Sequence, residues 1–428
     1  MISFNSEIKS ISACEVLDSR GNPTVEARVV LESGAIGCAS VPSGASTGVH
    51  EAIELRDKDN RFFGRGVMRA TDSVNTKIMP SLIGVSALEQ LRADSIMIAL
   101  DGTSNKSVLG ANAILAVSLA IARAAADHVG LPLYRYLGGN AKNSLPIPMM
   151  NILNGGVHAD NALDVQEFMI CPHGAENITE AVRMGSEIYF TLKKLLSDSD
   201  YSIAVGDEGG FAPNLKNEDE AIEFILKAIE KSGFKASADV SLALDVASSE
   251  WYDKKRKIYA MPKSQRTLSA EELSELLVNL VRKYPIISIE DGMAEDDFEG
   301  WKTLTEAIGD KTLLVGDDLF VTSKSRLESG VNIGIANSIL IKPNQIGTVS
   351  EVIETVEYAK AMGYKTIMSH RSGETADTFI ADFAVALGTE LVKFGAPARS
   401  ERTEKYNRLM KIESELFAPS YTGELLCL

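Results

Sequence analysis

The sequence predicts an α/β protein in two parts, a small N-terminal α+β unit followed by a (β/α)8 barrel. Mixed strand and helix patterns fill about the first 135 residues, and short apolar runs then alternate with amphipathic helices from about Leu145 onward. Several of these apolar runs end in a titratable residue, as the strands of enzyme barrels do. The 428 residues, 45% of them hydrophobic, suffice for both parts.

The N-terminal unit begins with a predicted antiparallel meander over residues 9–38. Its β-branched residues are interrupted by the turn signals Gly21-Asn22-Pro23 and Ser33-Gly34. Apolar residues then recur at helical spacing through residues 70–83 and 112–126. The meander and these two helices together predict the α+β class for this unit.

The most apolar stretch of the unit, residues 111–126, predicts a buried helix and not a membrane span. It is only 16 residues long and carries Ser118 and Arg123. Turn signals at Leu131-Pro132 and in the glycine-rich residues 137–140 follow it. We therefore expect one domain over residues 1–137 and a second over residues 138–428.

Helices of the second part are predicted by apolar faces with start and stop signals. Ser269-x-x-Glu272 is a capping box that opens an apolar face over residues 273–281. Similar faces run through residues 221–229 before Gly233 and through residues 349–356 before Gly363. These segments have the length and polarity of helices that cover a parallel sheet.

Six apolar runs end in a charged or titratable residue, and their order along the chain predicts the barrel. The residues are Asp245, Glu290, Asp317, Lys342, His370 and Lys393, with spacings of 45, 27, 25, 28 and 23 residues. Most of these spacings match one strand, one helix and two loops, and barrel chemistry lies at the strand ends of one mouth. A doubly wound sheet also alternates strands and helices, but the glycine-rich turn that usually follows its first strand is not found.

Composition limits the partners and the compartment. The formal net charge is −16, so an extended nucleic-acid interface is not expected, and the one dense basic run, residues 254–257, predicts a solvated hairpin. Four cysteines in a chain with a large core fit a reducing compartment. The N-terminus shows no targeting pattern, so we expect a cytoplasmic protein without membrane insertion.

Asp245, Glu290 and Asp317 predict a site for a divalent cation at the barrel mouth. A single Asp after a strand is commonly a helix N-cap, but three carboxylates at one mouth repel one another unless a cation or shared protons intervene. Oxygen ligands without Cys or His favour Mg²⁺ or Mn²⁺ over Zn²⁺.

The next strands bring cations to the same mouth, which predicts an anionic substrate. Arg371 with Ser372 has the donors that hold a phosphate. Lys342, crowded by Arg371, Lys393 and a metal, is expected to have a lowered pKa suited to a general base. The alternative for Lys342 is an ordinary salt bridge at a strand end.

Three loops add candidate groups that the pattern alone leaves open. Glu208 in the glycine-flanked loop of residues 206–210 is a candidate general acid with a raised pKa, or part of a polar turn. His158 and the pair Gln166-Glu167 are equally ambiguous. Ser43, which opens the small-residue loop Ser43–Gly48, is a candidate metal or phosphate ligand on a mobile lid, or part of a plain Gly/Ser turn.

The motifs resemble those of one family, enolase, from one end of the chain to the other. The matching stretches are LDSRGNPTVE, VPSGASTG, DGTSNKSVLGANAILAVSLA, NGGVHADN, VQEFMI, GDEGGFAPN, ALDVASSE, SIEDG, GDDLFVT, ILIKPNQIGT, SHRSGET and GAPARSER. The resemblance implies a modified eight-stranded barrel capped by the N-terminal domain. It implies a glycolytic and gluconeogenic lyase, phosphopyruvate hydratase, which reversibly dehydrates 2-phospho-D-glycerate to phosphoenolpyruvate. Enolases are homodimers or larger homo-oligomers such as octamers.

The resemblance also implies roles for individual residues. Lys342 is the base and Glu208 the acid. Two Mg²⁺ ions are implied, with Mn²⁺ as a substitute: Asp245, Glu290 and Asp317 hold the first, and Ser43 ligates the second. Lys393 binds the substrate carboxylate, Arg371 and Ser372 bind its phosphate, and the pocket around the substrate and its leaving hydroxyl is completed by His158, Gln166, Glu167 and His370.

Departures from the family pattern are few, and two rival functions share much of this pattern. Phe394 stands where a threonine is usual and adds bulk beside Lys393; Ala162-Leu163 and Ala376 also differ. One rival is an enolase-like enzyme acting on a phosphonate or related carboxylate analogue. The other is a catalytically silent scaffold, but no named catalytic group is lost from this chain.

Overall fold

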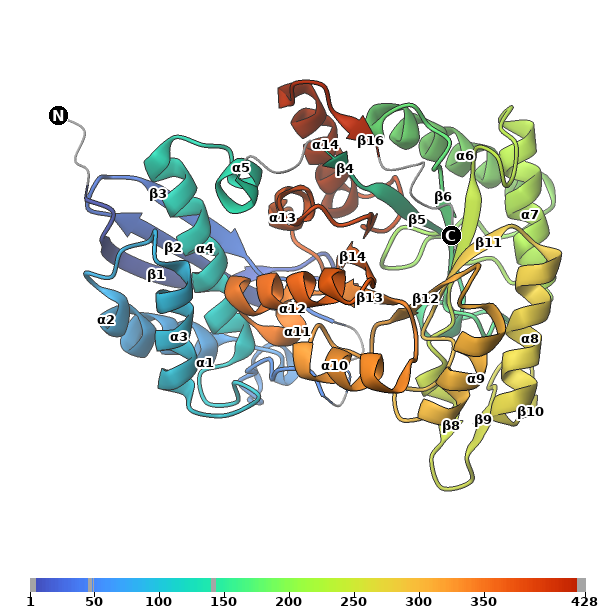
Figure 1. Cartoon of the computed structure of the whole chain (residues 1–428), viewed down its shortest axis with the longest axis horizontal. Helices are drawn as coiled ribbons and strands as arrows, with labels where there is room; N and C mark the ends of the chain where they lie inside the picture. Colours follow the sequence, from blue (N-terminus) through green and yellow to red (C-terminus); the bar gives the residue numbers. More distant parts are fainter. Residues whose placement is uncertain (1–4, 45–47, 49, 140–143, 422–428) are drawn as a thin grey trace.

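An antiparallel meander and the helices packed on it form the first part of the chain (Figure 1). This computed structural model describes residues 5–44, 48, 50–139 and 144–421. Strands β1 (Ile8–Leu17), β2 (Pro23–Leu31) and β3 (Ile36–Ser40) pair in the order β1-β2-β3. Gly21 and Gly34 have positive φ in the connecting turns, a conformation that suits glycine. The predicted meander is confirmed.

Both helical stretches predicted in this unit are helices. The first divides into α1 (Met68–Ser73), a π turn η2 (Val74–Ile78) and α2 (Met79–Leu82); the second is α4 (Ala111–Val129). Alanines on α4 allow it to approach the sheet so closely that a Cβ added to Gly37 would clash with the Ala120 oxygen. The remaining helical elements of the unit are η1 (Arg61–Gly64), α3 (Gln90–Asp101) and α5 (Leu133–Gly138).

Helix α4 is long and apolar enough to cross a membrane by length and composition, but it lies in the protein core. Within its most apolar window, 78% is buried inside the protein. It is the one helix in the described part of the chain that passes this test. Its burial against the sheet confirms the prediction of a core helix.

Eight strands close the barrel in the order β11-β12-β13-β14-β15-β5-β6-β7. Their bounds are β5 (Ile147–Asn154), β6 (Glu167–Cys171), β7 (Ser241–Asp245), β11 (Ile286–Glu290), β12 (Leu313–Gly316), β13 (Ser338–Ile341), β14 (Lys365–Ser369) and β15 (Leu391–Lys393). Strand β6 is antiparallel to both of its neighbours, whereas the other neighbouring pairs are parallel. The barrel therefore starts with a ββ connection, and the modified eight-stranded barrel that the resemblance implied is confirmed.

Helices surround the barrel and bury its outer face (Figure 1). They are α6 (Ile178–Asp198), α7 (Glu218–Lys231), α8 (Ala270–Lys283), α9 (Phe298–Ile308), α10 (Lys324–Ile333), α11 (Pro343–Ile346), α12 (Val349–Ala361), α13 (Phe379–Leu387) and α14 (Ser400–Glu415). Because both faces of the sheet are covered, strands such as β7 are buried at every residue. A separate apolar cluster that includes Met149, Val315 and Leu391 fills the barrel interior.

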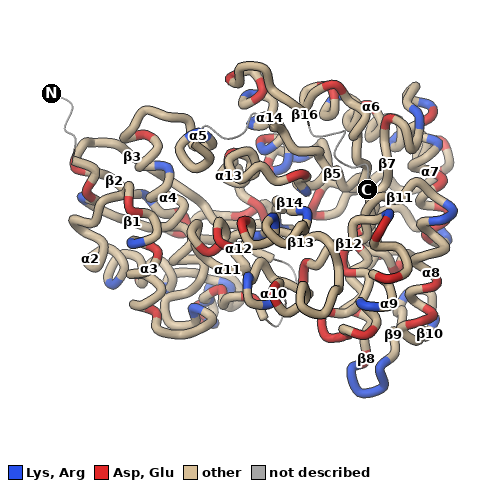
Figure 2. Tube along the Cα trace, in the orientation of Figure 1, with Lys and Arg blue, Asp and Glu red and all other residues tan. Residues whose placement is uncertain are grey.

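Short strands complete the structure. Strands β8 (Tyr252–Asp253), β9 (Ile258–Ala260) and β10 (Thr267–Leu268) follow the turn η4 (Ser248–Trp251), and β4 (Ser144–Leu145) pairs with β16 (Ser420–Tyr421). Residues 254–257 form the exposed, basic turn between β8 and β9 (Figure 2). The predicted solvated hairpin is confirmed.

Candidate active site

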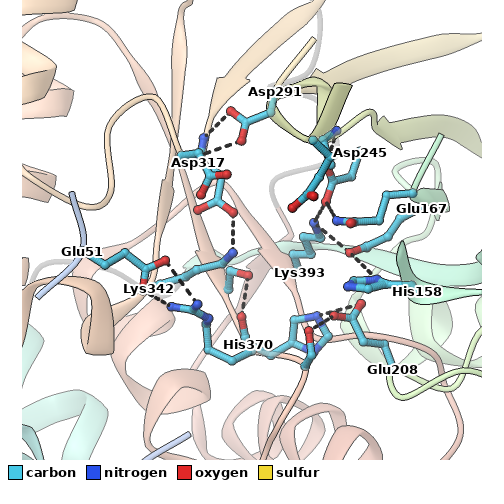
Figure 3. A pocket seen from close by; sticks show the side chains of 17 residues that line it. Glu51, His158, Glu167, Glu208, Asp245, Asp291, Asp317, Lys342, His370 and Lys393 are labelled. Carbon is cyan, nitrogen blue, oxygen red and sulfur yellow. Dashed lines mark hydrogen bonds and ion pairs between the residues drawn. The ribbon is translucent and has the colours of Figure 1, made fainter. Parts of the chain in front are cut away.

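The ends of the barrel strands converge on one polar cavity (Figure 3). Eleven of the residues singled out from the sequence line it: His158, Gln166, Glu167, Glu208, Asp245, Asp317, Lys342, His370, Arg371, Ser372 and Lys393. They come from loops and strands that are far apart in the chain, and parallel strands bring them to one mouth. Glu290 lies beside the cavity, and Ser43 does not line it.

Lysine side chains contact the predicted metal carboxylates directly. The Lys393 ammonium lies 2.9 Å from Asp245 Oδ2 and 2.8 Å from Glu290 Oε2, and 3.3 Å from Glu167 Oε1. On the other side of the cavity, Lys342 Nζ donates to Asp317 Oδ2. The two lysines do not simply face the acidic cluster across the mouth, as the sequence suggested; each forms ion pairs with it.

Negative charge in this cluster exceeds what the two lysines neutralise. Burial and the neighbouring Asp245 raise the pKa of Glu290 to about 8, although Lys393 opposes the shift. Burial and Asp317 raise the pKa of Asp318 to about 7. Burial and Asp318 likewise raise the pKa of Asp291 well above its usual value. Protonation or a bound cation would relieve this repulsion.

Asp291 organises the loop that carries Asp317 and was not singled out from the sequence. Its carboxylate accepts hydrogen bonds from the backbone N–H groups of Asp317 and Asp318, both at 2.9 Å. Ligand atoms of these three residues lie within 4.8 Å of one another, as do those of His158, Glu167 and Glu208. Among the described residues, these are the two groups compact enough to hold a metal ion.

The carboxylates fit a hard divalent cation by chemistry. Asp245, Glu290 and Asp317 present only oxygen donors, which suits Mg²⁺ or Mn²⁺. In this structure, however, the trio is not gathered as tightly as the Asp291 group, because the Lys393 ammonium lies between Asp245 and Glu290 while Asp317 contacts Lys342. A cation held by all three carboxylates would therefore have to replace these lysine contacts.

The pKa of Lys342 is raised in this structure, whereas the lowered value was expected for a lysine crowded by Arg371, Lys393 and a metal ion. Burial by itself lowers it, and Arg371 and Lys393 act in the same direction. The ion pair with Asp317 outweighs these effects. The neighbouring cations were anticipated correctly, but the direct contact with Asp317 was not.

Arg371 and Ser372 lie together at the end predicted to hold a phosphate. The Arg371 guanidinium donates to both carboxylate oxygens of Glu51, at 2.9 and 3.2 Å, and to Asn344 Oδ1 at 3.2 Å. Ser372 Oγ donates to Glu208 Oε1 at 3.1 Å. Glu51 places a negative charge against this guanidinium, where a bound substrate phosphate would also place negative charge. The sequence did not identify Glu51, because a single Glu after a loop gives no signal.

Glu208 lies in a network of hydrogen-bond donors, and its pKa is lowered. Burial raises the pKa, but His370 and His158 lower it by more. Asn151 Nδ2 also donates to Glu208 Oε2 at 3.1 Å. This corrects the prediction that neighbouring carboxylates drive Glu208 to its protonated form. Glu167 shows that behaviour instead, because burial and the Glu208 charge raise its pKa well above the usual value.

Several polar atoms that line the cavity have no hydrogen-bond partner in the described structure. They are Nδ1 of His158, Oε2 of Glu167 and Nε2 of His370, all fully enclosed. Buried polar atoms are rarely left unpaired, so these three atoms indicate where a polar ligand binds. Gln166 is held by a 3.2 Å hydrogen bond from its Nε2 to Asp245 Oδ2.

Ser43 is turned away from the cavity. Its hydroxyl donates to Glu54 at 3.1 Å and accepts from Arg56 at 2.9 Å, and its backbone pairs with Gly373. In this conformation Ser43 is not available to a metal ion at the mouth. Residues 45–47 and 49 of the predicted lid lie outside the described residues.

Phe394 does not narrow the pocket. Phe394 directly follows the last residue of β15; Lys393 lines the cavity, whereas Phe394 is fully buried and does not line it. The Phe394 ring lies against Tyr406 of α14, with ring centroids 5.9 Å apart. This departure from the family pattern therefore falls in the layer between the barrel and its helices, outside the lining of the cavity.

The chain matches one family along almost its whole length. A family model described as enolase, N-terminal domain, matches residues 8–137, and one described as enolase, C-terminal TIM barrel domain, matches residues 142–425. An enolase from a Nitratiruptor species is 59% identical over 419 residues, which cover 98% of this chain and 99% of that protein.

Together with these matches, the barrel and the acidic and cationic groups at its mouth define a lyase. The chain belongs to the enolase family. Its activity is therefore that of a phosphopyruvate hydratase, and the function implied by the sequence resemblance is confirmed. The alternative substrate, a phosphonate or other analogue, finds no support in these matches.

Proposed function

We propose that the cavity at the barrel mouth dehydrates 2-phospho-D-glycerate to phosphoenolpyruvate with Lys342 as the base and Glu208 as the acid. One observation carries this assignment: Lys342 at the end of β13 and Glu208 in the loop of residues 206–210 reach the same cavity from different sides (Figure 3), and the cationic groups Lys393 and Arg371 also line it. Elimination of water needs a base on one carbon and an acid on the neighbouring oxygen, so two groups on different sides fit it.

Lys342 removes the proton next to the substrate carboxylate. To do so it must lose its own proton, and the Asp317 ion pair opposes that loss. When Asp317 serves as a metal ligand, it holds the ammonium less strongly. Burial, Arg371 and Lys393 then favour the neutral amine, which can accept the proton.

Glu208 donates a proton to the departing hydroxyl. Hydroxide is a poor leaving group, so this donation contributes to the rate in the forward direction, and the same carboxylate activates water in the reverse direction. Its neighbour Glu167 has a raised pKa, which makes the pair able to carry one shared proton. His158, within 3.8 Å of Glu167, extends this pair toward the cavity.

The remaining groups bind and orient the substrate. Lys393 holds its carboxylate, Arg371 and Ser372 hold its phosphate, and Gln166 and His370 complete the pocket. Phosphate binding has to displace the Glu51 carboxylate from Arg371. A bidentate guanidinium contact of this kind fixes the substrate orientation as well as its charge.

We assign the first Mg²⁺ to Asp245, Glu290 and Asp317 and expect two ions per site, with Mn²⁺ as a substitute. Bound there, divalent cations stabilise the extra negative charge that develops on the substrate carboxylate when the proton leaves. Ser43 remains a predicted ligand of the second ion, which requires its hydroxyl to leave Glu54 and Arg56.

Turnover of 2-phosphoglycerate, followed by the ultraviolet absorbance of phosphoenolpyruvate, tests the assignment. The wild-type protein should be active with Mg²⁺ and inactive with EDTA, and Lys342→Ala should abolish turnover with the fold and Mg²⁺ affinity retained. Lys365→Ala is a matched control, since Lys365 begins strand β14 at the opposite end of the barrel. Near-normal kcat in Lys342→Ala would refute its role as the base.

Calorimetric titration with Mg²⁺ tests the metal ligands separately. Removing Asp317 takes away one oxygen ligand and the partner of Lys342. We expect Asp317→Ala to lose both Mg²⁺ binding and activity. An unchanged titration curve would contradict the ligand assignment.

We further infer a cytoplasmic homo-oligomer, a dimer or a larger assembly, that acts in glycolysis and gluconeogenesis. The family to which the chain belongs supports this inference. We also retain the division into an N-terminal domain of residues 1–137 and a barrel domain of residues 138–428.

A further inference from the structure

Arg402 lies behind the active site, fully buried, and none of the roles assigned above includes it. It belongs to helix α14, which packs on the outside of the barrel. Its Nη1 lies 2.6 Å from Nδ1 of His370 and donates to the Arg371 carbonyl oxygen at 2.6 Å. Its Nη2 donates to the carbonyl oxygens of Ser372, at 2.5 Å, and Asp207, at 3.2 Å. One guanidinium thus connects the loop that carries Glu208, the proposed acid, to Arg371 and Ser372, the proposed phosphate ligands.

The contact with His370 fixes where that imidazole carries its proton. An arginine guanidinium remains protonated in proteins and can only donate hydrogen bonds. Nδ1 must therefore accept, so the proton of the neutral ring is on Nε2. Nε2 points toward Glu208, 3.4 Å from its Oε2.

The backbone leaves room for this contact. Gly395 has a φ of +83°, and a Cβ at this position would lie 2.8 Å from Cδ of Arg402 and 2.9 Å from Cε1 of His370. A side chain there would separate the two groups. Glycine at this position therefore permits the approach of Arg402 to His370.

The charged groups that face His370 favour its neutral form. Burial lowers the pKa of His370 to about 3, with Arg402 and Lys393 acting in the same direction and only Glu208 opposing them. A protonated His370 would instead form an imidazolium–carboxylate pair with Glu208. Such a pair would hold Glu208 as a carboxylate and leave no proton on it for the departing hydroxyl.

We propose that Arg402 is a positioning residue that holds His370 in its neutral, Nε2-protonated form and so spares Glu208 the stronger hold that an imidazolium would have on its carboxylate. This inference rests on the proposed role of Glu208 as the acid. Arg402 itself does not line the cavity. Its effect on the reaction passes through His370 and through the backbone of residues 370–372.

The tautomer of His370 in the wild-type protein tests the proposal without reference to activity. NMR of protein labelled with ¹⁵N-histidine shows the signals of five imidazole rings. The signals that disappear in His370→Gln are those of His370. We expect an unprotonated Nδ1 and a protonated Nε2 that persist from pH 8 to pH 5. A proton on Nδ1, or an imidazolium at pH 7, would overturn the proposal.

Variants then test the consequence for the reaction. Arg402→Met should lower kcat about 10- to 100-fold, as loss of supporting groups around a site does. It should also move the acidic limb of the pH–kcat profile to higher pH as His370 takes up a proton. Arg402→Lys keeps a cation and a donor, so it should retain the neutral His370 and lose less activity.

Lys405→Met is the matched control. Lys405 is also fully buried on α14, but it contacts Glu374, the Thr375 carbonyl oxygen and the Glu401 carbonyl oxygen and does not contact His370. We expect it to lower the melting temperature while leaving the His370 tautomer and the acidic limb unchanged.

Equal effects of Arg402→Met and Lys405→Met on the acidic limb would reduce Arg402 to a structural residue and refute the proposal. A wild-type protein without turnover would refute the proposed function, whereas the tautomer measurement would still decide the role of Arg402.

Discussion

At the residue scale, the site consists of buried charges that satisfy one another through a few direct contacts. Lys393 contacts two carboxylates of the predicted metal site, and Arg371 contacts Glu51. Sequence motifs identified most of the groups at the mouth, because charged residues at the ends of apolar strands are visible in the sequence. The ion pairs between them depend on side-chain geometry, which is why neither the contact of Lys342 with Asp317 nor the lowered pKa of Glu208 was predicted.

His370 makes a prediction about stability and pH. In the folded protein, burial and Arg402 hold the pKa of His370 near 3, whereas its pKa in the unfolded chain is about 6.5. Between pH 6.5 and pH 3, His370 therefore binds a proton in the unfolded chain but not in the folded protein. Stability is therefore lost as the pH falls below about 6.5, by about 2 kcal/mol at pH 5.

Urea unfolding at pH 7.5 and pH 5 checks this. In His370→Gln, the loss of unfolding free energy between the two pH values should be about 2 kcal/mol smaller than in wild type. His128→Gln, which removes a half-buried imidazole on α4, is the control and should not show this reduction. Equal losses in wild type and His370→Gln would contradict a neutral, buried His370.

At the element scale, start and stop signals located several barrel helices correctly. The capping box at Ser269 and Glu272 forms as predicted at the start of α8. Side chains of Asn177, Asn217, Asp297 and Thr348 cap four further helices. The reversed direction of β6 was not visible in the same way, because a strand buried on both faces has the same apolar pattern in either direction.

Removing the α8 cap should lower stability without affecting the reaction. Ser269→Ala leaves the N–H of Glu272 without its side-chain acceptor, which typically costs about 1 kcal/mol. Thermal unfolding should show a lower midpoint, with kcat unchanged, since α8 does not contribute to the cavity. Glu275→Ala, an exposed change on the same helix, is the control. A midpoint as high as that of the control would mean that the capping box contributes nothing.

At the scale of the whole molecule, the N-terminal unit and the barrel are joined by partly buried ion pairs. Arg123 of α4 contacts both carboxylate oxygens of Asp377, at 2.6 and 2.7 Å, and Asp377 also accepts from the backbone of Ser40. Lys106 contacts Glu351 of α12 at 2.9 Å. No sequence pattern predicted these pairs, because their members lie more than 200 positions apart in the chain.

Breaking the Arg123 pair should weaken the junction between the two units. Asp377→Asn leaves the partly buried Arg123 without its counter-charge, and the cost should fall between the value for an exposed pair, about 1 kcal/mol, and that for a fully buried one, about 3 kcal/mol. We expect a lower melting temperature, or two separate unfolding transitions, in differential scanning calorimetry. An unchanged single transition would show that the pair does not stabilise the junction.

The whole-molecule charge also bears on function. A net charge of −16 repels an anionic substrate at long range, so the cationic groups at the mouth must make the site locally attractive. Figure 2 shows both signs of charge distributed along the chain, with blue segments near the ends of β13 and β14. The family and the fold were readable from the sequence for the same reason: long polar motifs mark the mouth, and apolar periodicity marks the layers around it.

Exchange of the substrate α-proton with deuterated solvent tests the division of roles between Lys342 and Glu208 most directly. With Mg²⁺ present, Glu208→Gln should still catalyse deuterium incorporation at C2 of 2-phosphoglycerate while forming no phosphoenolpyruvate, because the base remains and the acid is gone. Lys342→Ala should catalyse neither exchange nor turnover. Exchange in Lys342→Ala at the wild-type rate, or its loss in a folded Glu208→Gln protein that still binds Mg²⁺ and substrate, would contradict the assignment of base and acid.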